Sequence, residues 1–171
     1  MSLIEALIAL AIAAILMAAA MPMYSTWVMN TQIRTGAEAI VNGLQIARSE
    51  ALNRNANVQF AMTGSDTGWQ VSSLASDGTV VTVIQTRSGG AGSATATATP
   101  FPSAATAVTF NALGRKMLPT NPDNSVPIQQ INITTSITSS TGARALNITI
   151  SDGGQVRMCD PAFALPDSRG C

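Results

Sequence analysis

The stretch that decides the fold stands at the start of the chain, where residues 1–24 read MSLIEALIALAIAAILMAAAMPMY. From residue 6 to residue 21 every position is alanine, leucine, isoleucine or methionine, and the next charge after Glu5 is Arg34. An α-helix rises about 1.5 Å per residue, so residues 3–28 are long enough to cross a hydrocarbon core of roughly 30 Å. We therefore expect a membrane-capable helix at the start of the mature chain.

A secretory signal peptide is the alternative interpretation of this segment, because the three alanines at 18–20 are similar to a signal-peptidase site. A signal peptide opens with basic residues, whereas the one early charge here is the carboxylate of Glu5. The charge pattern therefore favours a helix that stays in the mature protein.

Glu5 is the one charged residue of the apolar segment. A carboxylate in such a helix costs several kcal/mol unless it is paired or reaches the membrane interface. One interpretation is local, in which Glu5 reaches the lipid headgroups or caps the amides of the helix N-terminus. The other is that Glu5 pairs with a cation from a second copy of the chain. Since no lysine or arginine is close, the α-amino group of Met1 is the nearest candidate.

The composition excludes most catalytic and metal-binding chemistry. The chain has 171 residues, enough for one domain and an accessory segment, and contains no histidine. Serine and cysteine triads that use histidine, and most zinc and copper sites, are thereby excluded. Nine basic and nine acidic residues give zero net charge, which argues against a general nucleic-acid binder. We expect no enzymatic activity, no cofactor and no metal.

A helical pattern continues after Pro22 with a single apolar face. The spacing predicts one helix from about residue 2 to about residue 53, roughly 75 to 80 Å long. Pro22 lacks an N–H group, so we expect a kink or a loosened turn at about residues 18–22. The apolar face consists of Ile33, Ala37, Ile40, Val41, Leu44, Ala47, Ala51 and Leu52.

From residue 55 onward the pattern changes to the alternation of β-strands. Six or seven short strands with turns between them predict an antiparallel head that folds against the amphipathic half of the helix. Two Gly-, Ser- and Pro-rich stretches, 88–103 and 117–127, are interpreted as surface loops. The predicted strands are 58–62, 69–74, 79–86, 106–111, 128–135, 145–151 and 155–159.

These patterns divide the chain into three parts and predict an α+β fold. Residues 1–28 form a hydrophobic N-terminal helix, residues 29–54 form the amphipathic half of the same helix, and residues 55–171 form a β-rich globular head. The predicted architecture is a long helical stalk packed against an antiparallel β-sheet.

Residues 1–12, MSLIEALIALAI, together with Pro22 and Tyr24, resemble the mature N-terminus of a type IV pilin or type II secretion pseudopilin. Met1 and Ser2 stand where phenylalanine and threonine are usual in that family. The resemblance implies the type IV pilin fold. It also implies that a prepilin peptidase removes a short basic leader after a glycine and that Met1 is then N-methylated.

The same resemblance implies how the protein is used. The precursor sits in the bacterial inner membrane and is moved by pilus or secretion machinery into a helical filament of like subunits, packed through their N-terminal helices. Glu5 then pairs with the N-terminal amine of Met1 in a neighbouring subunit, and the turn at Pro22 lets the helix extend. The filament lies outside the cell, or in the periplasm for a pseudopilus.

Cys159 and Cys171 are close in sequence, and a head outside the cytoplasm should join them by a disulfide. The bond would hold residues 160–170 in a C-terminal loop, a familiar element of pilins. Residues 154–159, GQVRMC, and residues 110–115, FNALGR, also resemble the GspH/FimT branch of the family.

Three functions follow as hypotheses. A weakly charged polar surface suits dense packing, which favours the repeating subunit of a pilus-like filament. The GspH/FimT resemblance favours a minor pilin or H-type pseudopilin that initiates or tips a filament. A minor pilin that captures DNA during transformation is the third, and its candidate DNA contacts are Arg115, Lys116, Arg157 and Arg169.

Overall fold

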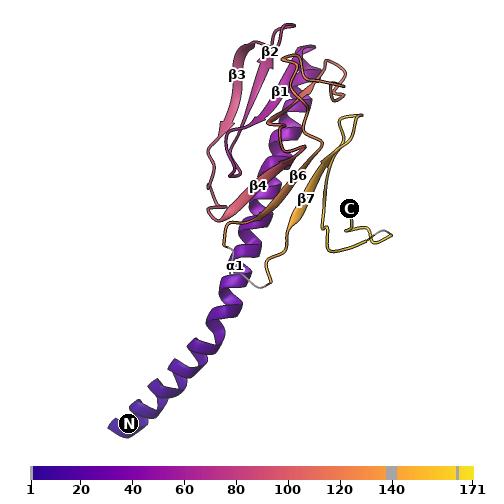
Figure 1. Ribbon diagram of the computed structural model, residues 1–171. Coiled ribbons are helices and arrows are strands. Elements are labelled where there is room, and N and C mark those ends of the chain that lie inside the picture. The colour runs from indigo at the N-terminus through magenta and orange to yellow at the C-terminus, as the bar shows by residue number, and fades with distance from the viewer. Residues whose placement is uncertain (1, 138–141, 165) are drawn as a thin grey trace.

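The computed structural model describes residues 2–137, 142–164 and 166–171. A single long helix, α1 (Leu3–Arg54), runs the length of the molecule, and the β-strands gather around its C-terminal half (Figure 1). Its apolar N-terminal end projects away from the head, and none of the described chain buries it (Figure 1). The predicted stalk with a β-rich head is confirmed.

The ends of α1 are fixed by its own residues. Ser2 and Glu5 form a capping box at the start, and Asn55 ends the helix in the left-handed conformation with its N–H donating to the Ala51 carbonyl. The loosened turn expected at residues 18–22 is absent from the single chain, because the helix is unbroken through Pro22. The kink expected there stays a prediction. A proline removes only one N–H from the helix, and the neighbouring turns keep their own bonds.

The C-terminal half of α1 buries one stripe of small and branched side chains against the sheets. Val41 is only partly buried, at the margin of this stripe. Leu52 is wrong as a core residue, because it is 50% exposed, with its side chain beside the turn at Gly114. The buried members of the stripe are Ile33, Ala37, Ile40, Leu44, Ala47 and Ala51.

In the described part of the chain, eight strands form two antiparallel four-stranded sheets. The first sheet has the order β3-β2-β1-β5, with β1 (Asn57–Met62), β2 (Trp69–Leu74), β3 (Val80–Arg87) and β5 (Ala107–Phe110). The second has the order β4-β6-β7-β8, with β4 (Ala96–Phe101), β6 (Gln130–Thr135), β7 (Leu146–Ile150) and β8 (Val156–Cys159). Each of the seven predicted strands is present with its ends shifted by no more than two residues.

One strand, β4, is additional to the seven predicted strands, and it corrects the interpretation of residues 88–103 as a loop. β4 pairs with β6 along its whole length, from Ala96 opposite Thr135 to Phe101 opposite Gln130. Its alternating alanines and threonines carry a weak hydrophobic signal, although Ala96 and Ala98 are buried. Because β4 is an edge strand, it also tolerates Pro100. The second predicted loop, 117–127, is confirmed to lack a strand among the described residues.

The core lies between the two sheets and the C-terminal half of α1, and its largest side chain is that of Trp69. The rings of Trp69 and Phe60 lie with centroids 5.9 Å apart and both are buried. Both rings press on the helix at Gly43, where a Cβ atom would lie 2.7 Å from Cε2 of Trp69. The absence of a side chain at this position lets the first sheet approach the helix closely.

Candidate functional site

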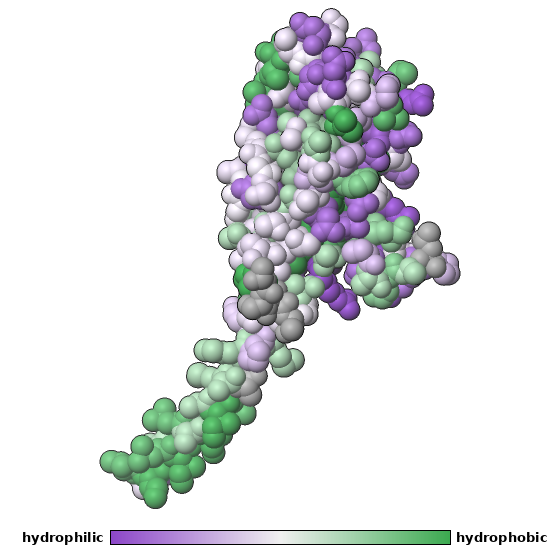
Figure 2. Space-filling model, in the orientation of Figure 1, coloured by the Kyte–Doolittle hydropathy of each residue, from purple (hydrophilic) through white to green (hydrophobic). Residues whose placement is uncertain are grey.

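The most unusual surface of the molecule is the N-terminal half of α1. By length and composition this is the one helix among the described residues that could cross a membrane. Its leucine, isoleucine and methionine side chains are exposed on all sides, for example Leu3 at 81% and Met23 at 78%. Figure 2 shows this apolar half ending where the polar surface of the head begins. A surface of this kind requires a lipid or protein covering.

Glu5 lies at the tip of this apolar half and is exposed. The backbone N–H of Ser2 donates to Glu5 Oε2 over 3.3 Å, and the Glu5 N–H donates to Ser2 Oγ over 3.4 Å. In the single chain Glu5 therefore makes the capping interaction that was one of its two predicted roles. Met1, the predicted partner amine and methylation site, lies outside the described residues.

The hydroxyl groups that follow Pro22 are directed back along the helix. Ser25 Oγ and Thr26 Oγ1 donate to the Pro22 carbonyl oxygen at 2.9 and 3.1 Å. Two exposed aromatic side chains, Tyr24 and Trp27, stand on the same turns with ring centroids 6.1 Å apart. Sequence reasoning missed this pair as a functional feature, although aromatic residues at the end of an apolar span are typical of membrane interfaces.

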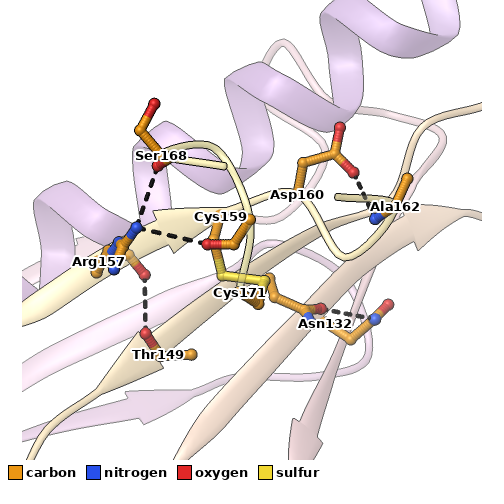
Figure 3. The surroundings of a disulfide bond; sticks show 10 residues. Asn132, Thr149, Arg157, Cys159, Asp160, Ala162, Ser168 and Cys171 are labelled. Carbon is orange, nitrogen blue, oxygen red and sulfur yellow. Dashed lines mark hydrogen bonds between the residues drawn. A yellow bond between two sulfur atoms is a disulfide. The ribbon is translucent and has the colours of Figure 1, made fainter. Parts of the chain in front are cut away.

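The C-terminal loop is closed by the predicted disulfide between Cys159 and Cys171, whose Cα atoms are 5.2 Å apart (Figure 3). Cys159 is buried at the end of β8. Arg157, on the same strand, reaches across the loop and donates to the carbonyl oxygens of Ser168 and Gly170 at 3.1 and 3.4 Å. The Asp160 N–H also donates to the Arg169 carbonyl over 2.7 Å. Backbone pairing and the disulfide therefore hold this loop together.

A second cluster in this loop surrounds Phe163. The Arg169 guanidinium lies 3.9 Å from the ring centroid and donates through Nη2 to Asp167 Oδ2 at 2.8 Å. That side-chain hydrogen bond, with a further one from the Arg169 backbone N–H, lowers the pKa of Asp167 to about 2. Arg144 approaches the same ring, at 6.0 Å from the centroid.

The four candidate DNA contacts have different environments. Lys116 is buried, and its Nζ atom donates to the Ile150 carbonyl at 3.2 Å and pairs with Asp152 at 3.0 Å. Arg157 and Arg169 are engaged within the C-terminal loop. Arg115 is exposed. DNA contact stays a prediction, and the buried position of Lys116 argues against its part in one. The described residues contain no group of three or more side chains that could hold a metal.

Comparison with known proteins points to one family. The model of the family described as type II transport protein GspH matches residues 36–154, more than two thirds of the chain. No curated protein matches the chain.

Two solved structures have a similar fold. Both are the type IV minor pilin FimU of Pseudomonas aeruginosa, in two crystal forms. The first has a TM-score of 0.56 with 22% identity over 78% of this chain and 92% of that chain. The second has a TM-score of 0.53 with 21% identity over 78% of this chain and 97% of that chain. The long helix, the antiparallel head and the disulfide-closed loop are thus the type IV pilin fold, and the chain belongs to the family of the type II transport protein GspH.

Proposed function

We propose that the protein is a structural subunit of a type IV pilus-like filament, which α1 anchors in the inner membrane before assembly. The observation that carries this proposal is the bare apolar half of α1 on a head of the GspH family. Lipid covers that surface in the precursor, and the helices of neighbouring subunits cover it in the filament. The role is structural rather than catalytic, in agreement with a sequence that has no histidine.

Glu5 directs assembly in this proposal. Its two bonds to Ser2 are long, at 3.3 and 3.4 Å, and the carboxylate is exposed at the end of the helix. A neighbouring subunit can therefore present the ammonium group of Met1 to Glu5 without displacing a buried partner. In an apolar surrounding such a pair is stronger than in water, and an unpaired carboxylate there is costly.

The test separates pairing from capping by two variants in cells that assemble the filament. Glu5→Ala removes both the charge and the cap, whereas Ser2→Ala removes only the hydroxyl of the capping box. We expect Glu5→Ala to accumulate as a membrane protein at the normal level but to be missing from sheared filaments. Ser2→Ala should still be incorporated. Normal filament incorporation of Glu5→Ala, or an equal loss in both variants, would refute the pairing role.

Family membership favours a minor pilin or H-type pseudopilin over the repeating subunit. A minor subunit initiates or tips the filament and is present in few copies. Mass spectrometry of sheared filaments against a labelled standard measures the copy number directly. A few copies per filament support the minor role, and a ratio equal to that of the most abundant filament protein supports the repeating one.

A further inference from the structure

The loop before β7 is fastened to α1 where the apolar half of the helix ends. Asn30 Oδ1 accepts a hydrogen bond of 2.8 Å from the Arg144 backbone N–H, and Asn30 Nδ2 donates to the Gly142 carbonyl at 3.3 Å. A Cβ atom at Gly142 would lie 3.2 Å from Cγ2 of Thr26. The position of Arg144 along the helix axis is therefore fixed by the side chain of Asn30.

The charge pattern of α1 gives the depth of this loop in a bilayer. With Glu5 at the cytoplasmic edge, a hydrocarbon core of roughly 30 Å ends about 20 residues later, near Thr26. The exposed ring of Trp27 then lies at the membrane interface. Asn30 is four residues further, roughly 6 Å beyond the hydrocarbon, which is the depth of the lipid phosphates.

Arg144 presents an exposed positive charge at that depth. No ion pair involves Arg144 within the described part of the chain, whereas the nearby Arg34 is paired with Glu38 at 2.9 Å. Arg144 lines a small cavity of about 220 Å³ with Asn30, Arg34, Leu146 and Asp160. The carboxylate of Asp160 also faces this cavity, and one of its oxygens accepts the Ala162 N–H at 2.9 Å.

We propose that Arg144 binds the phosphate group of an anionic phospholipid in the outer leaflet and thereby sets the height of the head above the membrane. Asn30 acts as the positioning residue. A guanidinium matches phosphate oxygens in both charge and geometry, and a site this close to the bilayer faces lipid before anything else. The inference rests on the proposed function, because it requires α1 to be inserted in the membrane.

The site is tested on the full chain in vesicles with the head outside, using phosphatidylcholine alone or with a third of it replaced by phosphatidylglycerol. Phenylglyoxal modifies accessible arginines, and mass spectrometry measures the rate at each residue. We expect Arg144 to react several-fold more slowly in the anionic vesicles, and less so at high salt. The exposed Arg115, in the turn that follows β5, should react at the same rate in both kinds of vesicle.

Brominated lipids measure the depth of Trp27 in the same vesicles, because Trp69 is buried and its emission stays constant. We expect phosphatidylglycerol to increase the quenching of Trp27 in the wild-type chain and in Arg115→Gln, but not in Arg144→Gln. If Trp27 is quenched but the phenylglyoxal reaction rate of Arg144 is the same in neutral and anionic vesicles, the lipid site is overturned and membrane anchoring stands. Unquenched Trp27 overturns the anchoring itself.

Two other occupants of the site give different results. If added inorganic phosphate protects Arg144 as well as anionic lipid does, the site binds free phosphate and the lipid assignment is overturned. If protection in neutral vesicles rises with protein density, an acidic group of a second copy occupies the site, and the lipid assignment is again overturned.

Discussion

Replacing Gly43 by alanine sets two opposing effects against each other. Alanine is favoured over glycine inside a helix by about 1 kcal/mol, so propensity alone predicts a more stable protein. The structure predicts the reverse. A Cβ atom at position 43 would lie 2.7 Å from Cε2 and 2.8 Å from Cδ2 of Trp69, and 2.8 Å from Cε2 of Phe60.

These contacts allow the size of the effect to be worked out. Carbon atoms pack at about 3.5 to 4.0 Å, so both buried rings must shift by roughly 1 Å. Overpacking of a core costs about 1 to 3 kcal/mol, and contact with two fully buried rings places Gly43→Ala near the upper value. After the gain in helix propensity, we expect a net loss of about 2 kcal/mol, which lowers the melting temperature by roughly 4 to 8 °C.

The assay is thermal unfolding of the full chain in a mild detergent, followed by tryptophan fluorescence and near-UV circular dichroism. Asn42→Ala is the matched control, because Asn42 is the adjacent helix residue and is exposed. This control should melt at or slightly above the wild-type temperature. In a Trp69→Phe background the cost of Gly43→Ala should shrink, since fewer ring atoms oppose the new methyl group. A Gly43→Ala protein that melts at or above the wild-type temperature refutes the reasoning.

The remaining predictions concern the C-terminal loop and the buried lysine. Cys171→Ser removes the disulfide between two cysteines that are 12 residues apart in sequence, so it should destabilise the head by about 3 kcal/mol. A reductant should lower the melting temperature of the wild-type protein to that of Cys171→Ser. The pKa of Asp167 is lowered to about 2, so its pairing with Arg169 stabilises the loop fully at pH values above the ordinary aspartate pKa of about 3.9. This stabilisation is lost as the pH falls toward 2. A carboxyl carbon-13 titration of Asp167 with a midpoint near pH 3.9 would contradict the prediction. Lys116→Met leaves the Ile150 carbonyl without its charged donor and should lower the free energy of unfolding by about 2 kcal/mol. Asp152→Asn should lower it by less, because the Asp152 side chain is 71% exposed. Equal melting temperatures of the two variants would contradict this difference.

Much of the fold could be predicted from sequence because two periodicities are strong. The buried stripe of the helix repeats every three to four residues, and seven strands alternate clearly enough to place their ends within two residues. The strand β4 was missed because its inward residues are Ala96 and Ala98, which add little hydrophobicity. Its stability comes from pairing with β6, more than thirty residues later, and that partner cannot be read from the local pattern.

The candidate site could be predicted in part. The apolar helix and the cysteine pair are marked by composition and spacing alone. The burial of Lys116 could not be predicted, because it depends on the Ile150 carbonyl and on Asp152 at the other end of the head sequence. The same is true of Arg144, whose depth is fixed by a hydrogen bond to Asn30 across 114 residues.

With α1 inserted in the membrane as proposed, the unbroken helix would act as a lever between the bilayer and the far end of the head. Arg54 stands roughly 40 Å beyond the place where the helix enters the head, so a tilt of about 20° at the membrane swings that end sideways by roughly 14 Å. Because Ile33, Ile40 and Leu44 of α1 pack in the same core as the strands, the two sheets should move with the helix as one rigid body. A force applied only to the apolar half of α1 would therefore move the far end of the head.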